Sequence, residues 1–280
     1  MTDAFDVQNL LKRLVQRGDD AERIMAGIFY QWLRAVVQGD IDFSYEVVQN
    51  IPPIMGTANG EVLQMVRDRM AGSTLMFMGD FREARLCFDR ILATYRPDDH
   101  AAGLARFGAT DNYTTVLCCL AAIEALDGSP VAARTAMARA LTTAEENGRV
   151  HNICHTLMYG VGLPAIICGD WAQVDAAADR LDGLAKLHNL DMWQSMAKLL
   201  RGIYLLAHQE NAHGDALFDD GADALSAQGI LFLMPTFRTL REVARVSQVA
   251  PSIEVVNALE RALNAGERWL LPLCRTLRHK

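Results

Sequence analysis

The feature that most limits the fold of this 280-residue chain is a short phrase that recurs along it. The phrase reads MGDFREA at residues 78–84, CGDWAQV at 168–174 and, more weakly, QGDIDF at 38–43. Each copy lies between two apolar runs of helical length. A glycine in the left-handed conformation ends one helix, and an aspartate side chain caps the next by accepting hydrogen bonds from its free amides. The phrase therefore predicts the joint of a helical hairpin.

A period of about forty residues runs through the whole chain. The small or branched residue four places after each aspartate position marks it, and the gaps between successive marks are 40, 49, 41, 40 and 41 residues. The marks are Ser44, Ala84, Ala133, Val174, Gly214 and Val255. Twelve places earlier most first helices carry a small residue, and four places later the second helix carries a packing residue such as Phe88 or Phe218. This resembles the tetratricopeptide pattern, stretched from its usual length of about 34 residues.

The period predicts an all-α fold: a right-handed α-solenoid of tetratricopeptide-like helical hairpins, forming one domain over residues 1–280 with about six hairpins. The alternative is an irregular helical domain in which glycine-aspartate turns recur by chance. Six aligned marks argue against it. The composition agrees, because the chain is 51% hydrophobic but only 7% aromatic, and it is rich in alanine and leucine.

Charge and hydropathy exclude several classes of function. The net charge of -7 does not favour direct nucleic-acid binding. The most apolar stretches, such as 161–168, are far shorter than the roughly 20 residues that cross a bilayer, so no membrane contact is expected. The six cysteines form no CxxC pair and lie mostly in apolar runs, which predicts buried thiols in a reducing, cytoplasmic compartment.

The longest gap contains an insertion, RPDDHAAGLARFGAT at residues 96–110. Its polar residues, proline and glycines predict an ordered surface loop. Insertions in repeat proteins usually cluster on one face, which is often the binding face.

Several short segments resemble one family along residues 60–270. They are YRPDDH at 95–100, RFG at 106–108, residues 117–126 with Ala133, GDW at 169–171, LDMW at 190–193, RG at 201–202 and GERW at 266–269. On these residues the chain resembles the tetratricopeptide-rich C-terminal region of large bacterial ATPase regulators, whose N-terminal part is a winged-helix DNA-binding domain or a class III adenylate cyclase. The resemblance implies a sensing or scaffolding role. This chain lacks the GxxxxGK[ST] phosphate loop, a basic recognition helix and the cyclase carboxylate pair, so ATP hydrolysis and DNA contact are not implied.

A binding groove is expected where the first helices of the hairpins line a concave face. With the marks as register, the groove-facing positions hold Phe29, Arg69, Ser73, Cys118, Tyr159, Leu163, Leu199, Ile203 and Leu240. The row is mostly apolar with one cation, which suits an amphipathic helix or extended peptide whose carboxylate meets Arg69. The alternative is a tight superhelix in which these side chains only pack.

Catalytic and metal-binding patterns are weak. His151 and His155 are spaced i, i+4 and offer a metal pair, but no third ligand has suitable spacing. Cys118 and Cys119 lie in an apolar run and are expected to be buried rather than redox-active. The four tryptophans are interpreted first as packing residues. The sequence therefore predicts no enzyme activity, no metal and no cofactor.

The segment 267–280 looks like the first helix of a further hairpin with no second helix after it. Its apolar residues point all round, so it docks on a partner or on a second copy, giving a homodimer, or the chain is a fragment. The leading hypothesis is a non-catalytic protein- or peptide-binding or sensor module of a bacterial regulatory protein in transcription or signalling. The alternative is a small-molecule effector module whose repeats enclose the ligand and change curvature.

Overall fold

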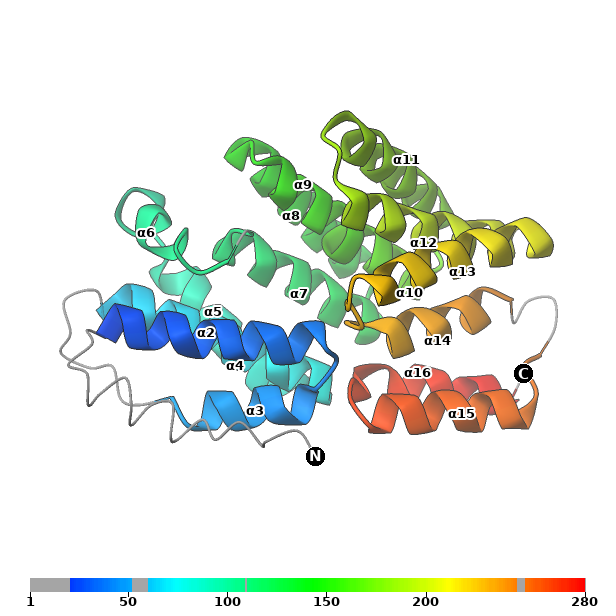
Figure 1. Ribbon diagram of the computed structural model, residues 1–280, viewed down its shortest axis with the longest axis horizontal. Helices are drawn as coiled ribbons and strands as arrows, with labels where there is room; N and C mark the ends of the chain where they lie inside the picture. Colours follow the sequence, from blue (N-terminus) through cyan, green and yellow to red (C-terminus); the bar gives the residue numbers. More distant parts are fainter. Residues whose placement is uncertain (1–20, 52–59, 109, 246–249, 280) are drawn as a thin grey trace.

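The computed structural model describes residues 21–51, 60–108, 110–245 and 250–279, and within these ranges it contains helices and turns but no strand (Figure 1). The predicted all-α class is confirmed. In chain order the elements are α2 (Ala21–Val37), α3 (Ile41–Gln49), α4 (Gly60–Met78), α5 (Phe81–Thr94), α6 (Pro97–Leu104), α7 (Asn112–Leu126), α8 (Pro130–Asn147), α9 (Val150–His155), the π-helix η1 (Thr156–Gly162), α10 (Leu163–Cys168), α11 (Trp171–Leu187), α12 (Asp191–Ala207), α13 (Asn211–Ala227), α14 (Met234–Arg245), α15 (Ile253–Asn264), the 3-10 turn η2 (Arg268–Leu270), α16 (Leu271–Thr276) and the 3-10 turn η3 (Leu277–His279).

Each recurring glycine-aspartate phrase joins two helices that pack on each other. The three glycines have left-handed φ angles of 74°, 87° and 68°. Asp40 and Asp80 each accept a hydrogen bond from the backbone amide three residues later, at 3.0 and 3.3 Å. Asp170 accepts no such bond. Its carboxylate lies 3.5 Å from Arg134 instead, so the cap predicted at Asp170 is wrong.

The paired helices approach closely where the sequence places small residues. A Cβ added at Gly72 would lie 2.5 Å from the Phe88 ring, and one at Gly202 would lie 2.7 Å from a backbone oxygen of α13. The last mark of the period is displaced by one residue: Val255 is 40% exposed, and Val256 is buried in its place. Helix α15 therefore begins one residue later than the period predicts.

The first and last parts of the described chain meet (Figure 1). The backbone oxygen of Val37, at the end of α2, accepts hydrogen bonds from the amides of Leu231 and Phe232 at 2.9 and 3.1 Å. Arg268 of η2 forms an ion pair of 2.6 Å with Asp42 of α3. We call these contacts the closure. They join segments that are more than 190 residues apart in the sequence.

The C-terminal segment is not the single unpaired helix predicted for 267–280. It consists of η2, α16 and η3, which pack on α15, and η2 also contacts α4. Trp269, Leu270, Cys274 and Leu277 are buried in the common core. Pro272 occupies the first turn of α16. Amides in the first turn have no acceptor within the helix, so the missing amide hydrogen of proline costs no helical hydrogen bond there. The chain itself thus covers much of the apolar surface that we expected a partner to cover.

The described residues of the insertion, 96–108 and 110, include a helix where an ordered surface loop was predicted. Pro97 begins the helix α6, and His100 Nδ1 accepts a hydrogen bond from the Arg96 amide at 3.0 Å. His100 Nε2 lies 3.1 Å from a carboxylate oxygen of Glu61 on α4. Beyond α6 the Phe107 side chain is buried. The insertion is therefore fastened to α4 at one end and enters the core at the other.

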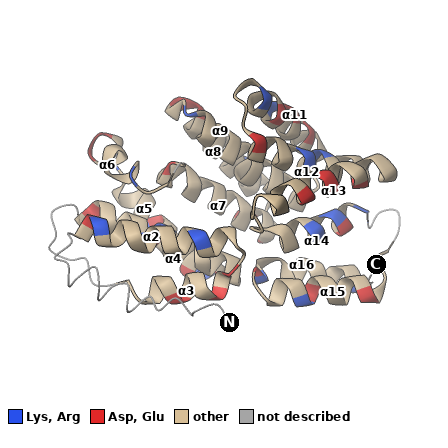
Figure 2. Ribbon diagram, in the orientation of Figure 1, with Lys and Arg blue, Asp and Glu red and all other residues tan. Residues whose placement is uncertain are grey.

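Charged residues of both signs occupy the outward surfaces of α11 to α14 (Figure 2). Arg85 on α5 pairs with Glu124 on α7 at 2.6 Å, and Arg241 on α14 pairs with Asp219 on α13 at 3.0 Å. Such partly exposed pairs contribute little stability each, about 1 kcal/mol or less. Among the described helices, none is both long and apolar enough to cross a membrane.

Candidate functional site

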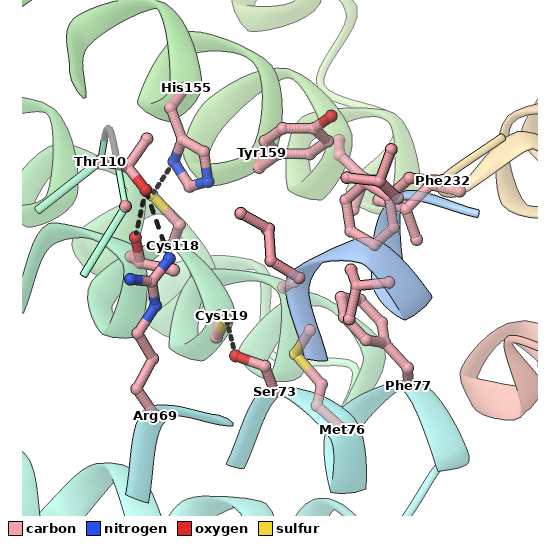
Figure 3. A pocket seen from close by; sticks show the side chains of 18 of the residues that line it. Arg69, Ser73, Met76, Phe77, Thr110, Cys118, Cys119, His155, Tyr159 and Phe232 are labelled. Atoms are coloured by element: carbon pink, nitrogen blue, oxygen red, sulfur yellow. Dashed lines mark hydrogen bonds between the residues drawn. The ribbon is translucent and has the colours of Figure 1, made fainter. Parts of the chain in front are cut away.

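A cavity of 390 Å³ lies where the first helices of successive pairs face one another. Its walls come from α2, α4, α7, the α9–η1–α10 helix and α12, with the end of the insertion, the segment before α14 and Trp269 of η2 completing them. Figure 3 shows side chains of α4, α7, the α9–η1–α10 helix, the insertion and the segment before α14 converging on it. Most are apolar. The closure is part of its wall, because Val37, Phe232 and Trp269 belong both to the cavity and to the segments that meet there.

The structure brings together six of the nine predicted groove residues. Those lining the cavity are Phe29, Arg69, Ser73, Cys118, Tyr159 and Leu163. The other three, Leu199, Ile203 and Leu240, are fully buried in the hydrophobic core and are not among the lining residues. Helix α12 faces the cavity with Met192, Trp193 and Met196 near its start, so the row predicted on it lies one or two turns too far along. The role of all nine in binding remains a prediction.

Arg69 on α4 is the charged residue of the cavity. Its side chain is 5% exposed. Nη1 donates to Asn112 Oδ1 at 2.9 Å and to the Phe107 backbone oxygen at 3.3 Å, and Nη2 donates to Thr110 Oγ1 at 3.3 Å. Its Nε atom is buried and has no hydrogen-bond partner among the described residues. Burial lowers the pKa of Arg69 to about 10, so the guanidinium stays protonated at neutral pH.

Cys118 and His155 lie beside Arg69, with Sγ 3.8 Å from Nδ1 (Figure 3). Burial raises the pKa of Cys118 to about 12, and the thiol also contacts Thr156 Oγ1 at 3.6 Å. Burial and the charge of Arg69 lower the pKa of His155 to about 3. Both groups are therefore neutral at pH 7. A cysteine nucleophile needs a thiolate, and these surroundings oppose one.

The opposite end of the cavity is aromatic (Figure 3). The Phe77 ring lies edge-on to Phe232 and to Trp269, with centroids 5.2 and 5.6 Å apart, and Phe232 lies 5.7 Å from Tyr159. Tyr159 donates its hydroxyl hydrogen to Met196 Sδ at 3.8 Å. Burial, with the nearby charge of Glu267, raises the pKa of Tyr159, so the phenol stays neutral.

His151 and His155 are not equivalent. His151 is exposed, and its Nδ1 accepts a hydrogen bond of 3.1 Å from the Trp193 indole, whereas His155 faces Cys118. In the described ranges, no group of three or more His, Cys, Asp or Glu side chains is placed to hold a metal ion. The pair is better explained by packing against aromatic rings, with His155 centred 5.0 Å from Tyr159.

Comparisons with protein-family models, with curated proteins and with solved structures gave no match. The assignment of a function therefore depends on the residues and geometry of this cavity.

Three of the four tryptophans do more than the packing role expected of them. Trp32, Trp193 and Trp269 line the cavity, while each indole N–H donates to a side chain, at 2.9, 3.1 and 2.8 Å. Sequence reasoning also missed Thr110 and Phe232, which lie outside the first helices. The RFG segment at 106–108 was a signal for the insertion, but nothing local to the sequence places the Phe232 segment against α4.

Proposed function

We propose that this chain is a sensor module that binds a small, largely apolar molecule in its central cavity. The observation that carries the proposal is an apolar cavity of 390 Å³ lined by α2, α4, α7, the α9–η1–α10 helix and α12 and bounded by the closure. This volume is within the range of small-molecule sites, about 300–1,000 Å³. A bound helix about 10–12 Å across would need a wider, open groove. The geometry thus favours the small-molecule hypothesis over the peptide groove.

The order of the helix pairs supports the finer interpretation of the fold. First helices lie inside and second helices outside, as in a right-handed α-solenoid of tetratricopeptide-like hairpins that forms one domain. A ligand that contacts both α4 and the segment before α14 would bind the closed form better than an opened one, and would shift the population toward it. The resemblance to bacterial ATPase regulators suggests that a fused or partner protein in the cytoplasm reads this change, with no catalysis by the chain itself.

Filling the cavity tests this function. Ala122 lines the cavity from α7 and is 2% exposed, so Ala122→Phe places a ring in the ligand space. We expect the neutral fluorophore N-phenyl-1-naphthylamine to bind the natural chain and to lose at least about tenfold in affinity for the variant, a change of roughly 1.4 kcal/mol. Val131→Phe, on the exposed face of α8, is the matched control and should bind as the natural chain does.

Unchanged binding by a folded Ala122→Phe variant would overturn the proposal. If that variant unfolds, Met196→Trp fills the same cavity from α12 and provides the same comparison. Far-ultraviolet circular dichroism identifies which variants are folded before binding is measured.

A further inference from the structure

Arg69 is a buried cation without a matching anion. It is the only Asp, Glu, Lys or Arg among the described residues that line the cavity, and its three hydrogen-bond acceptors are neutral. It forms no ion pair with a described carboxylate. By contrast, Arg90 on α5 holds Asp68 with two hydrogen bonds, at 3.2 and 2.6 Å. A buried charge costs several kcal/mol unless an opposite charge compensates it, so an unmatched arginine beside a cavity indicates an anionic ligand.

The unused donors of Arg69 lie on one edge of the guanidinium. Of its five N–H groups, the three observed bonds use both hydrogens of Nη1 and one of Nη2. The Nε–H, which has no hydrogen-bond partner among the described residues, lies on the same edge of the guanidinium as one N–H of Nη2. Arg90 uses this edge to bind Asp68, and Arg278 uses it to bind Glu260 at 3.0 and 2.6 Å. The spacing of the two donors matches the two oxygens of a carboxylate.

No described group around this edge carries a negative charge that neutralises Arg69, although its guanidinium carbon also lies 5.6 Å from the centre of the Phe29 ring. The Cys118 thiol and the His155 ring are neutral, and Thr110 presents a hydroxyl. The carboxylate of Asp111 contributes to the field at Arg69, but it caps α7 by accepting from the Thr114 amide and hydroxyl at 2.7 and 2.8 Å. The positive charge of Arg69 is therefore left for a ligand.

The rest of the cavity sets the shape of that ligand. Phe77 and Phe232 lie across the cavity from Arg69, Thr110 and His155 (Figure 3). A cavity of about 150 Å³ holds benzene, so 390 Å³ leaves room for roughly fifteen non-hydrogen atoms. The space thus has Arg69 at one end and the Phe77 and Phe232 rings at the other.

We propose that the ligand is a carboxylate with an apolar body of about ten carbon atoms, its carboxylate on Arg69 and its body against Phe77 and Phe232. This inference rests on the function proposed above. It adds the charge, the orientation and the size of the ligand, none of which follows from an apolar cavity alone.

The test compares three ten-carbon probes of different charge by titration calorimetry and by the fluorescence of the three cavity tryptophans. Below its micelle concentration at pH 7.4, decanoate should bind at least about tenfold more tightly than 1-decanol, and protonated decylamine should bind most weakly of the three. Arg69→Met should remove the preference for decanoate and leave the affinity for decanol within about twofold. Arg134→Met, on the outer surface of α8, is the control and should keep the preference.

The outcomes separate the two proposals. Equal affinity for decanoate and decanol would overturn the anionic ligand and leave the cavity function in place. If none of the three probes binds and N-phenyl-1-naphthylamine does not bind either, both the anionic ligand and the cavity function are overturned. If Arg69→Met unfolds, the comparison of the three probes on the natural chain still tests whether the ligand is anionic. Arg69→Lys keeps the charge but loses the two-donor edge, so it should retain only part of the preference for decanoate.

Discussion

At the scale of single residues, the glycines inside helices differ in what surrounds them. Gly72 faces the Phe88 ring at a distance that leaves no room for a methyl group, whereas an added Cβ at Gly183 on α11 would meet no atom within 4 Å. Both positions are helical. The contrast separates the packing role of glycine from its conformational cost.

We predict opposite effects for two glycine-to-alanine substitutions. Gly72→Ala should lower the free energy of unfolding by about 1–3 kcal/mol, because α4 and α5 must move apart or Phe88 must leave its rotamer. Gly183→Ala should raise it by about 0.5–1 kcal/mol, because alanine has the higher helix propensity. Urea denaturation of both variants measures the two values. A Gly72→Ala variant as stable as the natural chain would contradict the close approach of α4 and α5.

At the scale of helices, two similar joints have different chemistry. Asp80 caps α5 through its carboxylate, while Asp170 at the equivalent place makes no capping bond and faces Arg134. The two sequences, GDF and GDW, are almost the same. The difference arises because a neighbouring helix supplies a cation beside one carboxylate.

We predict that Asp80→Ala lowers the free energy of unfolding by about 1 kcal/mol, as loss of an N-cap usually does. Asp170→Ala should lower it by about 0.5 kcal/mol or less, since only a partly exposed ion pair is lost. Thermal denaturation of the two variants side by side makes the comparison. Equal losses would show that the Asp170 carboxylate caps α11 in solution.

The π-helix η1 is a further feature of element scale that periodicity does not predict. Pro164 has no amide hydrogen for the carbonyl four residues earlier, and the seven residues of η1 end just before it. This helix and the residues that flank it place His155, Tyr159 and Leu163 on the cavity wall. Apolar residues at helical spacing predict a helix here. The wider π-helical turn arises because Pro164 removes one backbone hydrogen bond.

At the scale of the whole molecule, Glu267 links the C-terminal segment to α14. Its buried carboxylate accepts hydrogen bonds from the Leu233 amide at 2.6 Å, the Thr236 amide at 3.3 Å and the Thr236 hydroxyl at 2.8 Å. Burial raises the pKa of Glu267 to about 7, although these hydrogen bonds act to lower it. The cap of α14 thus comes from a residue 31 positions away from Thr236.

We predict a pH dependence of stability that reports on Glu267. Because the folded pKa lies above the unfolded value, the folded state binds more protons between about pH 4.5 and 7. The contribution of Glu267 is therefore fully present below pH 4.5 and declines as the pH rises through 7, by at most about 3 kcal/mol. The lowered pKa of His155 has the opposite effect: it reduces the stability of the folded state as the pH falls below 6.5. This loss should be the same in the natural chain and in a Glu267 variant.

Melting temperatures of the natural chain and of Glu267→Gln at pH 5 and pH 8 provide the measurement. The natural chain should lose stability relative to the variant between these values. A constant difference across the range would show that Glu267 stays ionised throughout and that its cap tolerates the charge.

Local patterns were enough to predict the helices, most of the joints and six of the residues that line the cavity. The glycine-aspartate phrase acts within a few residues, and the small residue twelve places before each mark acts within one hairpin. Both effects can therefore be predicted from neighbouring residues in the sequence. Arg69, Cys118 and Tyr159 were chosen in this way, and all three line the cavity. The displaced mark at Val255 shows the limit, because a helix that begins one residue later buries the next side chain, Val256, instead.

The tertiary structure alone decided that the chain closes on itself and which residues meet inside. Small rotations between successive hairpins accumulate, and their sum determines whether Val37 reaches Leu231. The total rotation depends on how neighbouring helices pack, and the residue type at any one position does not specify that packing. The closure buries Trp269, converts a predicted open groove into a cavity and leaves Arg69 without a carboxylate partner beside an aromatic space.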